Sequence, residues 1–246
     1  KYRSEIDGLR ALAVVPVILF HAGFEIFSGG FVGVDVFFVI SGYLITTIII
    51  KESDEGKFSF SNFYERRARR ILPALCFVIM CSIPFAWYLL LPNDMEDFAA
   101  NVGTAAIFLS NFYLLSQTGY FAADAHLQPF VHTWSLSIEE QFYLLFPVLL
   151  LTSLNKSWRF TISLTALVFL GSLLCAEWGW RVKPEDNYYH SLTRFWELLV
   201  GSFTAFYLTR RKIKMELWRS NFLSFVGLLA IVYSVFTFDE TTPFPS

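Results

Sequence analysis

Long apolar runs alternate with short polar segments along this chain of 246 residues. About eight of the runs are long enough, or nearly so, to cross a hydrocarbon core of roughly 30 Å as helices. They cover residues 9–27, 31–50, 71–91, 98–115, 140–154, 160–178, 191–208 and 222–238. Gly29 and Gly30 interrupt the pattern between the first two runs, which predicts a helical hairpin there. The whole pattern predicts an all-α fold, a polytopic transmembrane helical bundle.

The composition supports a membrane protein. Apolar residues make up 55% of the chain and charged residues 16%, whereas a soluble domain carries charge at about a quarter of its positions. The mean hydropathy is +0.49. Cys76, Cys81 and Cys175 are odd in number and fall in apolar runs, so they predict neither a disulfide framework nor a metal site.

The distribution of charge predicts the topology. Basic residues gather in segments 51–70 and 209–219, and such segments usually face the cytoplasm. Segment 92–97 is acidic, which suits the opposite side. The amino terminus is then cytoplasmic.

Two apolar runs lie where this topology requires an odd number of crossings. We therefore expect one of 98–115 and 140–154 to be re-entrant, interfacial or broken; 140–154 is the shorter run, but the sequence does not decide between them. Irregular backbone at membrane depth is tolerated where it lines a cavity or is buried in protein. The sequence therefore predicts a cavity near residues 116–140.

Arg10, His21 and Asp35 lie within the first two runs, where an ionisable group is costly and by default marks a functional site. Arg10 and His21 share one helical face, about 16 Å apart along the axis. His21 would lie about 18 Å, and Asp35 about 24 Å, from the inner boundary. These depths predict that Asp35 orients His21 as a base toward a hydroxyl. Alternatively, Arg10 is a cytoplasmic anchor and His21 a hydrogen-bonded core residue.

An arginine cluster follows the second run. Arg66 and Arg69, and likewise Arg67 and Arg70, are three positions apart, so each pair shares a helical face. Planar guanidinium groups suit phosphate oxygens, which predicts a cytoplasmic ligand with several phosphates. The alternative is that these arginines hold the segment inside.

A polar segment opens the run at 140–154. Ser137 and Glu140 match a capping box, which predicts a helix start at Ser137 and a structural role for Glu140. Glu139 is not explained in this way and is our candidate functional carboxylate. His132 and Trp134 either line the expected cavity or belong to an interfacial aromatic belt.

Two further segments have simpler interpretations. Arg194 and Glu197 fit an interfacial ion pair at a helix end. Gly42, between Ser41 and Tyr43, fits close helix contact, and Ser41 and Tyr43 are also candidate cavity-lining residues.

These pieces, in this order, resemble the integral-membrane acyltransferase-3 family of bacterial O-acyltransferases. The resemblance rests on five blocks, and the opening block looks most like acetylases of O-antigen and surface polysaccharides. The blocks are 2–11 with His21, 29–43, 63–73, 133–143 and 193–201.

The resemblance implies transfer of an acetyl group from cytoplasmic acetyl-CoA to a hydroxyl of an extracytoplasmic glycan such as lipopolysaccharide O-antigen. By this resemblance Arg10, His21 and Glu139 match functional positions of the family. Arg66, Arg67, Arg69 and Arg70 match its arginine-pair motif, thought to contact the acyl donor. No permanently bound cofactor and no metal are expected.

The resemblance also bears on completeness. The family typically has ten core helices, and many members of the subgroup carry an SGNH hydrolase-like domain after them. We therefore expect residues 1–246 to be one transmembrane domain that lacks late helices and any such domain.

A proton-coupled transporter of a small solute is the main alternative, because the charged residues within the apolar runs could form a proton relay. The arginine pairs favour the enzyme, since such a carrier has no evident need of a site for several phosphates. A third hypothesis, a non-catalytic membrane scaffold, predicts that changes at His21 and Asp35 affect stability alone.

Overall fold

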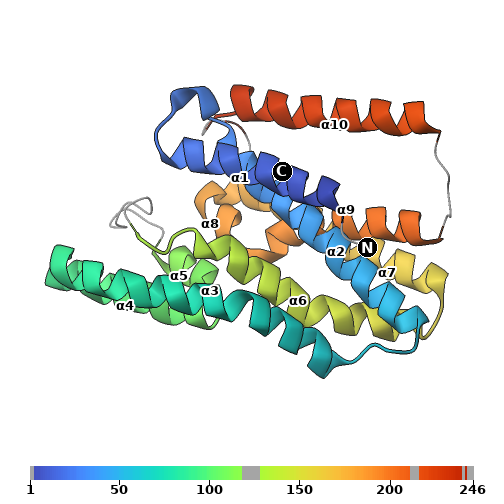
Figure 1. Cartoon of the computed structure of the whole chain (residues 1–246), viewed down its shortest axis with the longest axis horizontal. Helices are drawn as coiled ribbons and strands as arrows, with labels where there is room; N and C mark the ends of the chain where they lie inside the picture. The colour runs from blue at the N-terminus through green and yellow to red at the C-terminus, as the bar shows by residue number, and fades with distance from the viewer. Residues whose placement is uncertain (1–2, 118–127, 211–215, 240–241, 243–246) are drawn as a thin grey trace. The chain divides into compact units, whose positions relative to one another are not determined.

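The computed structural model describes residues 3–117, 128–210, 216–239 and 242, and the regular elements in these ranges are all helical. The helices are α1 (Ser4–His21), α2 (Gly33–Asp54), α3 (Phe60–Leu89), α4 (Pro92–Ala106), α5 (Ser110–Ser116), α6 (Thr133–Leu154), α7 (Trp158–Val182), α8 (Pro184–Tyr189), α9 (Ser191–Arg210) and α10 (Leu217–Thr237) (Figure 1). Two 3-10 turns, η1 (Glu25–Phe27) and η2 (Gly30–Val32), connect α1 to α2. The predicted all-α fold and the hairpin at Gly29 and Gly30 are confirmed.

Four segments are long and apolar enough to cross a membrane within the described ranges. They are Gly30–Asp54, Phe60–Leu89, Trp158–Val182 and Leu217–Thr237. The chain is therefore a multi-pass membrane protein. It divides into two compact units: unit 1 comprises residues 1–48 and 196–244, and unit 2 comprises residues 49–195.

Glycines let backbones approach closely in unit 1. A Cβ atom at Gly30 would lie 2.3 Å from the carbonyl oxygen of Pro16, and one at Gly29 would lie 2.1 Å from that of Ser234. The amide of Gly29 also donates to the carbonyl oxygen of Val235 at 3.0 Å. The turns after α1 therefore hold the end of α10 through backbone contact.

The predicted close contact at Gly42 is confirmed, and α9 is the partner. A Cβ at Gly42 would lie 1.8 Å from the carbonyl oxygen of Leu198, and one at Gly201 would lie 2.0 Å from that of Val39. Next to this crossing, the buried hydroxyl of Thr46 donates to Ser202 at 2.8 Å. Small residues and a hydroxyl pair are the usual means of joining helices in lipid.

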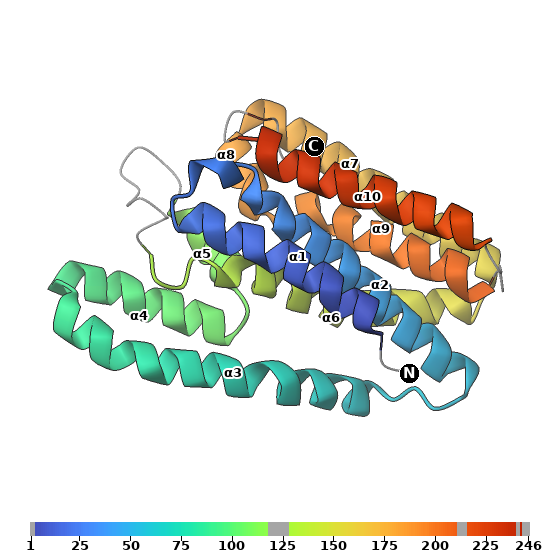
Figure 2. The same cartoon turned by 45° about the horizontal axis from the view of Figure 1, so that its top comes forward.

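In unit 2 the run at 98–115 is the broken one. α3 and α4 lie side by side, and the chain then reverses into the short helix α5 (Figure 2). The reversal places Phe108 at φ 56°, a left-handed conformation that is unusual for a bulky residue. The run at 140–154 lies instead inside α6, which is continuous over 22 residues and packs against α5 and α7.

The predicted capping box at Ser137 and Glu140 is wrong. α6 begins at Thr133 with His132 at its N-cap, so Ser137 lies inside the helix. Its hydroxyl donates to the carbonyl oxygen of Thr133 at 3.1 Å. The helix starts earlier than predicted because residues 130–134 already form hydrogen-bonded turns, from Thr133 to Phe130 and from Trp134 to Val131.

We expect Gly42→Ala to destabilise the protein by about 1–3 kcal/mol, since the added methyl group must displace the backbone of α9. The measurement is thermal unfolding of the purified protein in detergent. Gly171→Ala in α7 is the matched control, because a Cβ there meets nothing within 4 Å. Equal melting temperatures for the two variants would contradict the close contact.

Candidate functional site

The charged face of α6 lies against α3. The guanidinium carbon of Arg67 lies 5.0 Å from the ring centroid of Tyr143 and 5.8 Å from that of Phe63. Both rings are buried, and Arg67 itself is half-buried. Such cation–π contacts stabilise a desolvated guanidinium by about 2 kcal/mol each.

Tyr143 connects this arginine to a carboxylate. Its hydroxyl donates to Oε2 of Glu139 at 3.2 Å, one helical turn earlier on α6. Oε1 of the neighbouring Glu140 is buried and has no hydrogen-bond partner among the described residues. Arg67 is close enough to act electrostatically on both carboxylates. We call Arg67, Tyr143, Glu139 and Glu140 the acid–arginine cluster.

The other arginines predicted to bind the donor differ from Arg67. One terminal nitrogen of Arg66 donates to both carboxylate oxygens of Glu52, at 2.8 and 2.9 Å. Arg69 pairs with Glu65 at 2.6 Å, and Arg70 is exposed. The structure thus brings Arg67 to Glu139, whereas Arg66 and Arg69 already hold carboxylates that a phosphate would have to displace.

The unit 1 candidates lie on α1 and α2. Arg10 pairs with Asp7 at 3.6 Å, and its side chain is 28% exposed. His21 is the last residue of α1 and is exposed, with Nδ1 2.8 Å from the carbonyl oxygen of Val17. Asp35 lies in the first turn of α2, and its Oδ2 is buried. The pairing of His21 with Asp35 stays a prediction.

The candidates for cavity lining fall in three settings. His132 is exposed, Ser41 is buried, and Tyr43 accepts a hydrogen bond from Arg3. Trp134 is buried, 4.8 Å from Tyr188 between ring centroids. Part of the predicted cavity, residues 118–127, lies outside the described residues.

Arg194 is fully buried, whereas the sequence predicted an interfacial ion pair with Glu197 at a helix end. Its guanidinium carbon lies 5.5 Å from the ring centroid of Trp134 and 5.3 Å from that of Tyr188. The contact of Tyr143 with Glu139 could have been predicted from the sequence, because the two residues are four positions apart and share a helical face. Tyr188 is near Arg194 in the sequence, but Trp134 is far from it, so the burial of Arg194 between the two rings has no complete local signal.

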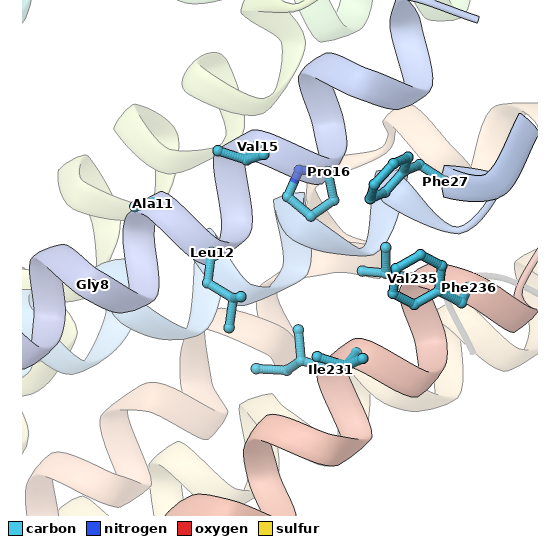
Figure 3. Close-up of a pocket in the computed structure, with 10 residues that line it drawn as sticks. Gly8, Ala11, Leu12, Val15, Pro16, Phe27, Ile231, Val235 and Phe236 are labelled. Carbon is cyan, nitrogen blue, oxygen red and sulfur yellow. The ribbon is translucent and has the colours of Figure 1, made fainter. Parts of the chain in front are cut away.

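An apolar groove of about 430 Å³ lies in unit 1 between α1 and α10 (Figure 3). Side chains such as Leu12, Val15, Phe27 and Phe236 line it, and no charged residue does. Because a phosphate needs hydrogen-bond donors or cations, this groove is no site for a charged donor. In the described ranges no three His, Cys, Asp or Glu residues are grouped to hold a metal ion.

Comparison with known proteins finds similar sequences but no similar solved structure. The chain is 40% identical over 202 residues to BcsY of Komagataeibacter xylinus, named as a membrane-bound transacylase, covering 81% of this chain and 50% of the relative. It is 35% identical over 213 residues to O-acetyltransferase OatA of Staphylococcus aureus, covering 84% and 35%. No solved structure matches it significantly.

A third relative, YrhL of Bacillus subtilis, is named as a peptidoglycan O-acetyltransferase and is 33% identical over 262 residues, covering 99% of this chain and 40% of the relative. The chain thus spans half or less of the length of these three relatives. The acyltransferase domain of the acyltransferase-3 family matches residues 3–243, nearly the whole chain. The chain therefore belongs to the acyltransferase-3 family, as its five sequence blocks indicated.

Proposed function

We propose that this chain forms the membrane part of an O-acetyltransferase. It would move an acetyl group from cytoplasmic acetyl-CoA to a hydroxyl of an extracytoplasmic glycan. Membership of the acyltransferase-3 family and the names of OatA and YrhL support an enzyme over a proton-coupled transporter. Acetyl-CoA would be a substrate and not a resident cofactor.

The acid–arginine cluster is the observation that carries the proposal. It joins the arginine-rich start of α3 to the carboxylates of α6 within one unit. The guanidinium of Arg67 packs on the ring of Tyr143, and the hydroxyl of Tyr143 donates a hydrogen bond to Glu139. Arg66, Arg69 and Arg70 lie within the same turn and a half of α3, next to Arg67. A donor with several phosphates would exchange the carboxylates now paired with Arg66 and Arg69 for phosphate oxygens.

Transfer requires a base for the acceptor hydroxyl. Since a carbonyl oxygen can only accept, Nδ1 of His21 carries the proton donated to Val17, and Nε2 then has the lone pair that can accept one. The hydroxyl oxygen forms a bond to the acetyl carbon, the carbon–sulfur bond breaks, and the thiolate of CoA takes up a proton. A buried cation next to the thioester would stabilise the oxyanion that forms in between.

The relatives and the resemblance of the opening block support a choice of acceptor. YrhL is named for peptidoglycan, whereas that block resembles O-antigen acetylases. We propose a cell-envelope glycan, with lipopolysaccharide O-antigen first, and an inner-membrane protein with a cytoplasmic amino terminus. The basic segments 51–70 and 209–219 support this orientation.

Loss of His21 should abolish glycan acetylation. Mass spectrometry would compare O-antigen and peptidoglycan from cells that carry the intact gene, no gene, or the gene with His21→Ala. We expect the acetyl mass increment on one glycan with the intact gene alone, at equal amounts of protein in the membrane. An increment that persists with His21→Ala would remove His21 from the mechanism, and one that is unchanged without the gene would refute the function.

Removal of Arg67 should weaken binding of acetyl-CoA about 10- to 100-fold, since a charge-assisted hydrogen bond contributes about 1.5–3 kcal/mol. Titration calorimetry of the purified protein would measure this for Arg67→Ala. Arg159→Ala, which removes an exposed arginine at the start of α7, is the control. Equal affinities in the two variants would exclude Arg67 from the donor site.

Tyr143→Phe should separate binding from transfer. The ring that packs under Arg67 remains, so we expect the affinity for acetyl-CoA to change less than about threefold. The hydrogen bond to Glu139 is lost, so we expect transfer to fall about tenfold or more. A variant with transfer equal to that of the unchanged protein would show that Glu139 does not depend on Tyr143.

A further inference from the structure

A closed ring of side-chain hydrogen bonds joins three residues of unit 2 that come from three helices. Gln141 on α6 donates to Oδ1 of Asn111 at 2.9 Å, Asn111 on α5 donates to Oγ of Ser191 at 3.0 Å, and Ser191 on α9 donates to Oε1 of Gln141. We call these three residues the amide ring. Asn111 is 0% exposed and Ser191 5% exposed.

The ring leaves no amide hydrogen unused. Gln141 gives its second N–H to the carbonyl oxygen of Phe108 at 2.9 Å, and Asn111 gives its second to that of Tyr189 at 3.1 Å. Both carbonyl groups lie just before a helix, Phe108 before α5 and Tyr189 before α9. A buried polar network of this kind specifies one arrangement when every member is satisfied.

The ring also holds the reversal between α4 and α5. Phe108 has a left-handed backbone that costs a bulky residue about 1–3 kcal/mol. Gln141 captures the carbonyl oxygen of this same residue. One turn earlier on α6, Ser137 hydrogen-bonds to Ser110, the first residue of α5, at 2.7 Å. α5 is therefore attached to α6 at two successive turns.

Ser137 and Gln141 form one face of α6, and Glu139 and Tyr143 form the other. The two pairs are offset by two residues, which is about 200° around a helix. Fixing Ser137 and Gln141 to α5 therefore fixes the direction in which Glu139 and Tyr143 point toward α3.

We propose that Asn111 and Gln141 are positioning residues for the transfer step, which set the rotation of α6 and thereby the orientation of Glu139 against Arg67. This proposal rests on the proposed function and extends it to two neutral residues on the far side of α6. Neither residue touches the donor. Their loss should lower transfer while leaving the affinity for acetyl-CoA nearly unchanged.

The test compares isosteric and apolar changes in the full-length protein. Asn111→Asp and Gln141→Glu each remove both N–H donors at constant shape, and we expect transfer to fall about tenfold or more. Replacing both residues by leucine leaves the carbonyl oxygens of Phe108 and Tyr189 without these donors, so we expect part of the thermal stability to be lost and transfer to stay low. Asn155→Asp, at the exposed end of α6, should behave like the unchanged protein.

A second measurement detects a rotation of α6 and does not depend on acetyl transfer. The three cysteines of the chain, Cys76, Cys81 and Cys175, are first replaced by alanine. Glu139→Cys or Leu144→Cys is then introduced, and the rate at which each new thiol reacts with a thiol reagent is measured; Leu144 is 60% exposed. We expect Asn111→Asp to change the ratio of the two rates at least threefold. An unchanged ratio, or normal transfer by the double leucine variant, would overturn the proposal. If the unchanged protein transfers no acetyl group, while Asn111→Asp still changes the ratio, the proposed function is refuted and the positioning is not.

Discussion

The cost of keeping charged and polar groups among apolar helices is the constraint that organises unit 2. A guanidinium that leaves water loses its hydration and needs partners on every side. The guanidinium of Arg67 packs against two aromatic rings and interacts electrostatically with two carboxylates. Arg194, fully buried, lies against Trp134 and Tyr188. These aromatic residues come from different helices, so the helices must take one arrangement for either arginine to be stable.

Unit 1 meets a different constraint, because lipid provides little hydrophobic force between helices. Close approach of backbones replaces it. Gly42 and Gly201 bring α2 and α9 together so closely that a single methyl group would collide with a carbonyl oxygen. Gly29 and Gly30 do the same between the turns after α1 and the neighbouring helices. Such contacts depend on shape alone, and these four glycines lie in the sequence blocks 29–43 and 193–201.

The sequence predicted what depends on local pattern and missed what depends on distant partners. Apolar runs predicted the helices, the glycine pair predicted the first hairpin, and Gly42 predicted a close crossing. Run length could not show that 98–115 is the broken segment, because the break rests on Gln141 holding the carbonyl oxygen of Phe108. The capping box failed for a related reason, since Ser137 bonds to Ser110 instead of starting a helix. The pairing of arginines with Glu52 and Glu65 likewise became visible only in the structure.

One face of α6 carries neutral hydrogen-bonding groups, and the other face carries charged groups. Neutral amides cost less to desolvate than ions, so Asn111 of the amide ring can be fully buried and the ring can keep one geometry. The opposite face carries Glu139 and Tyr143 and lies against Arg67 of α3. The adjacent Glu140 keeps a buried oxygen without a hydrogen bond in the described part of the chain. A carboxylate that is partly removed from water interacts strongly with an ion that comes close, because the local dielectric constant is low. A helix fixed by neutral bonds on one side can therefore change its charge pairing on the other side without moving, as the proposed exchange of carboxylates for donor phosphates would require.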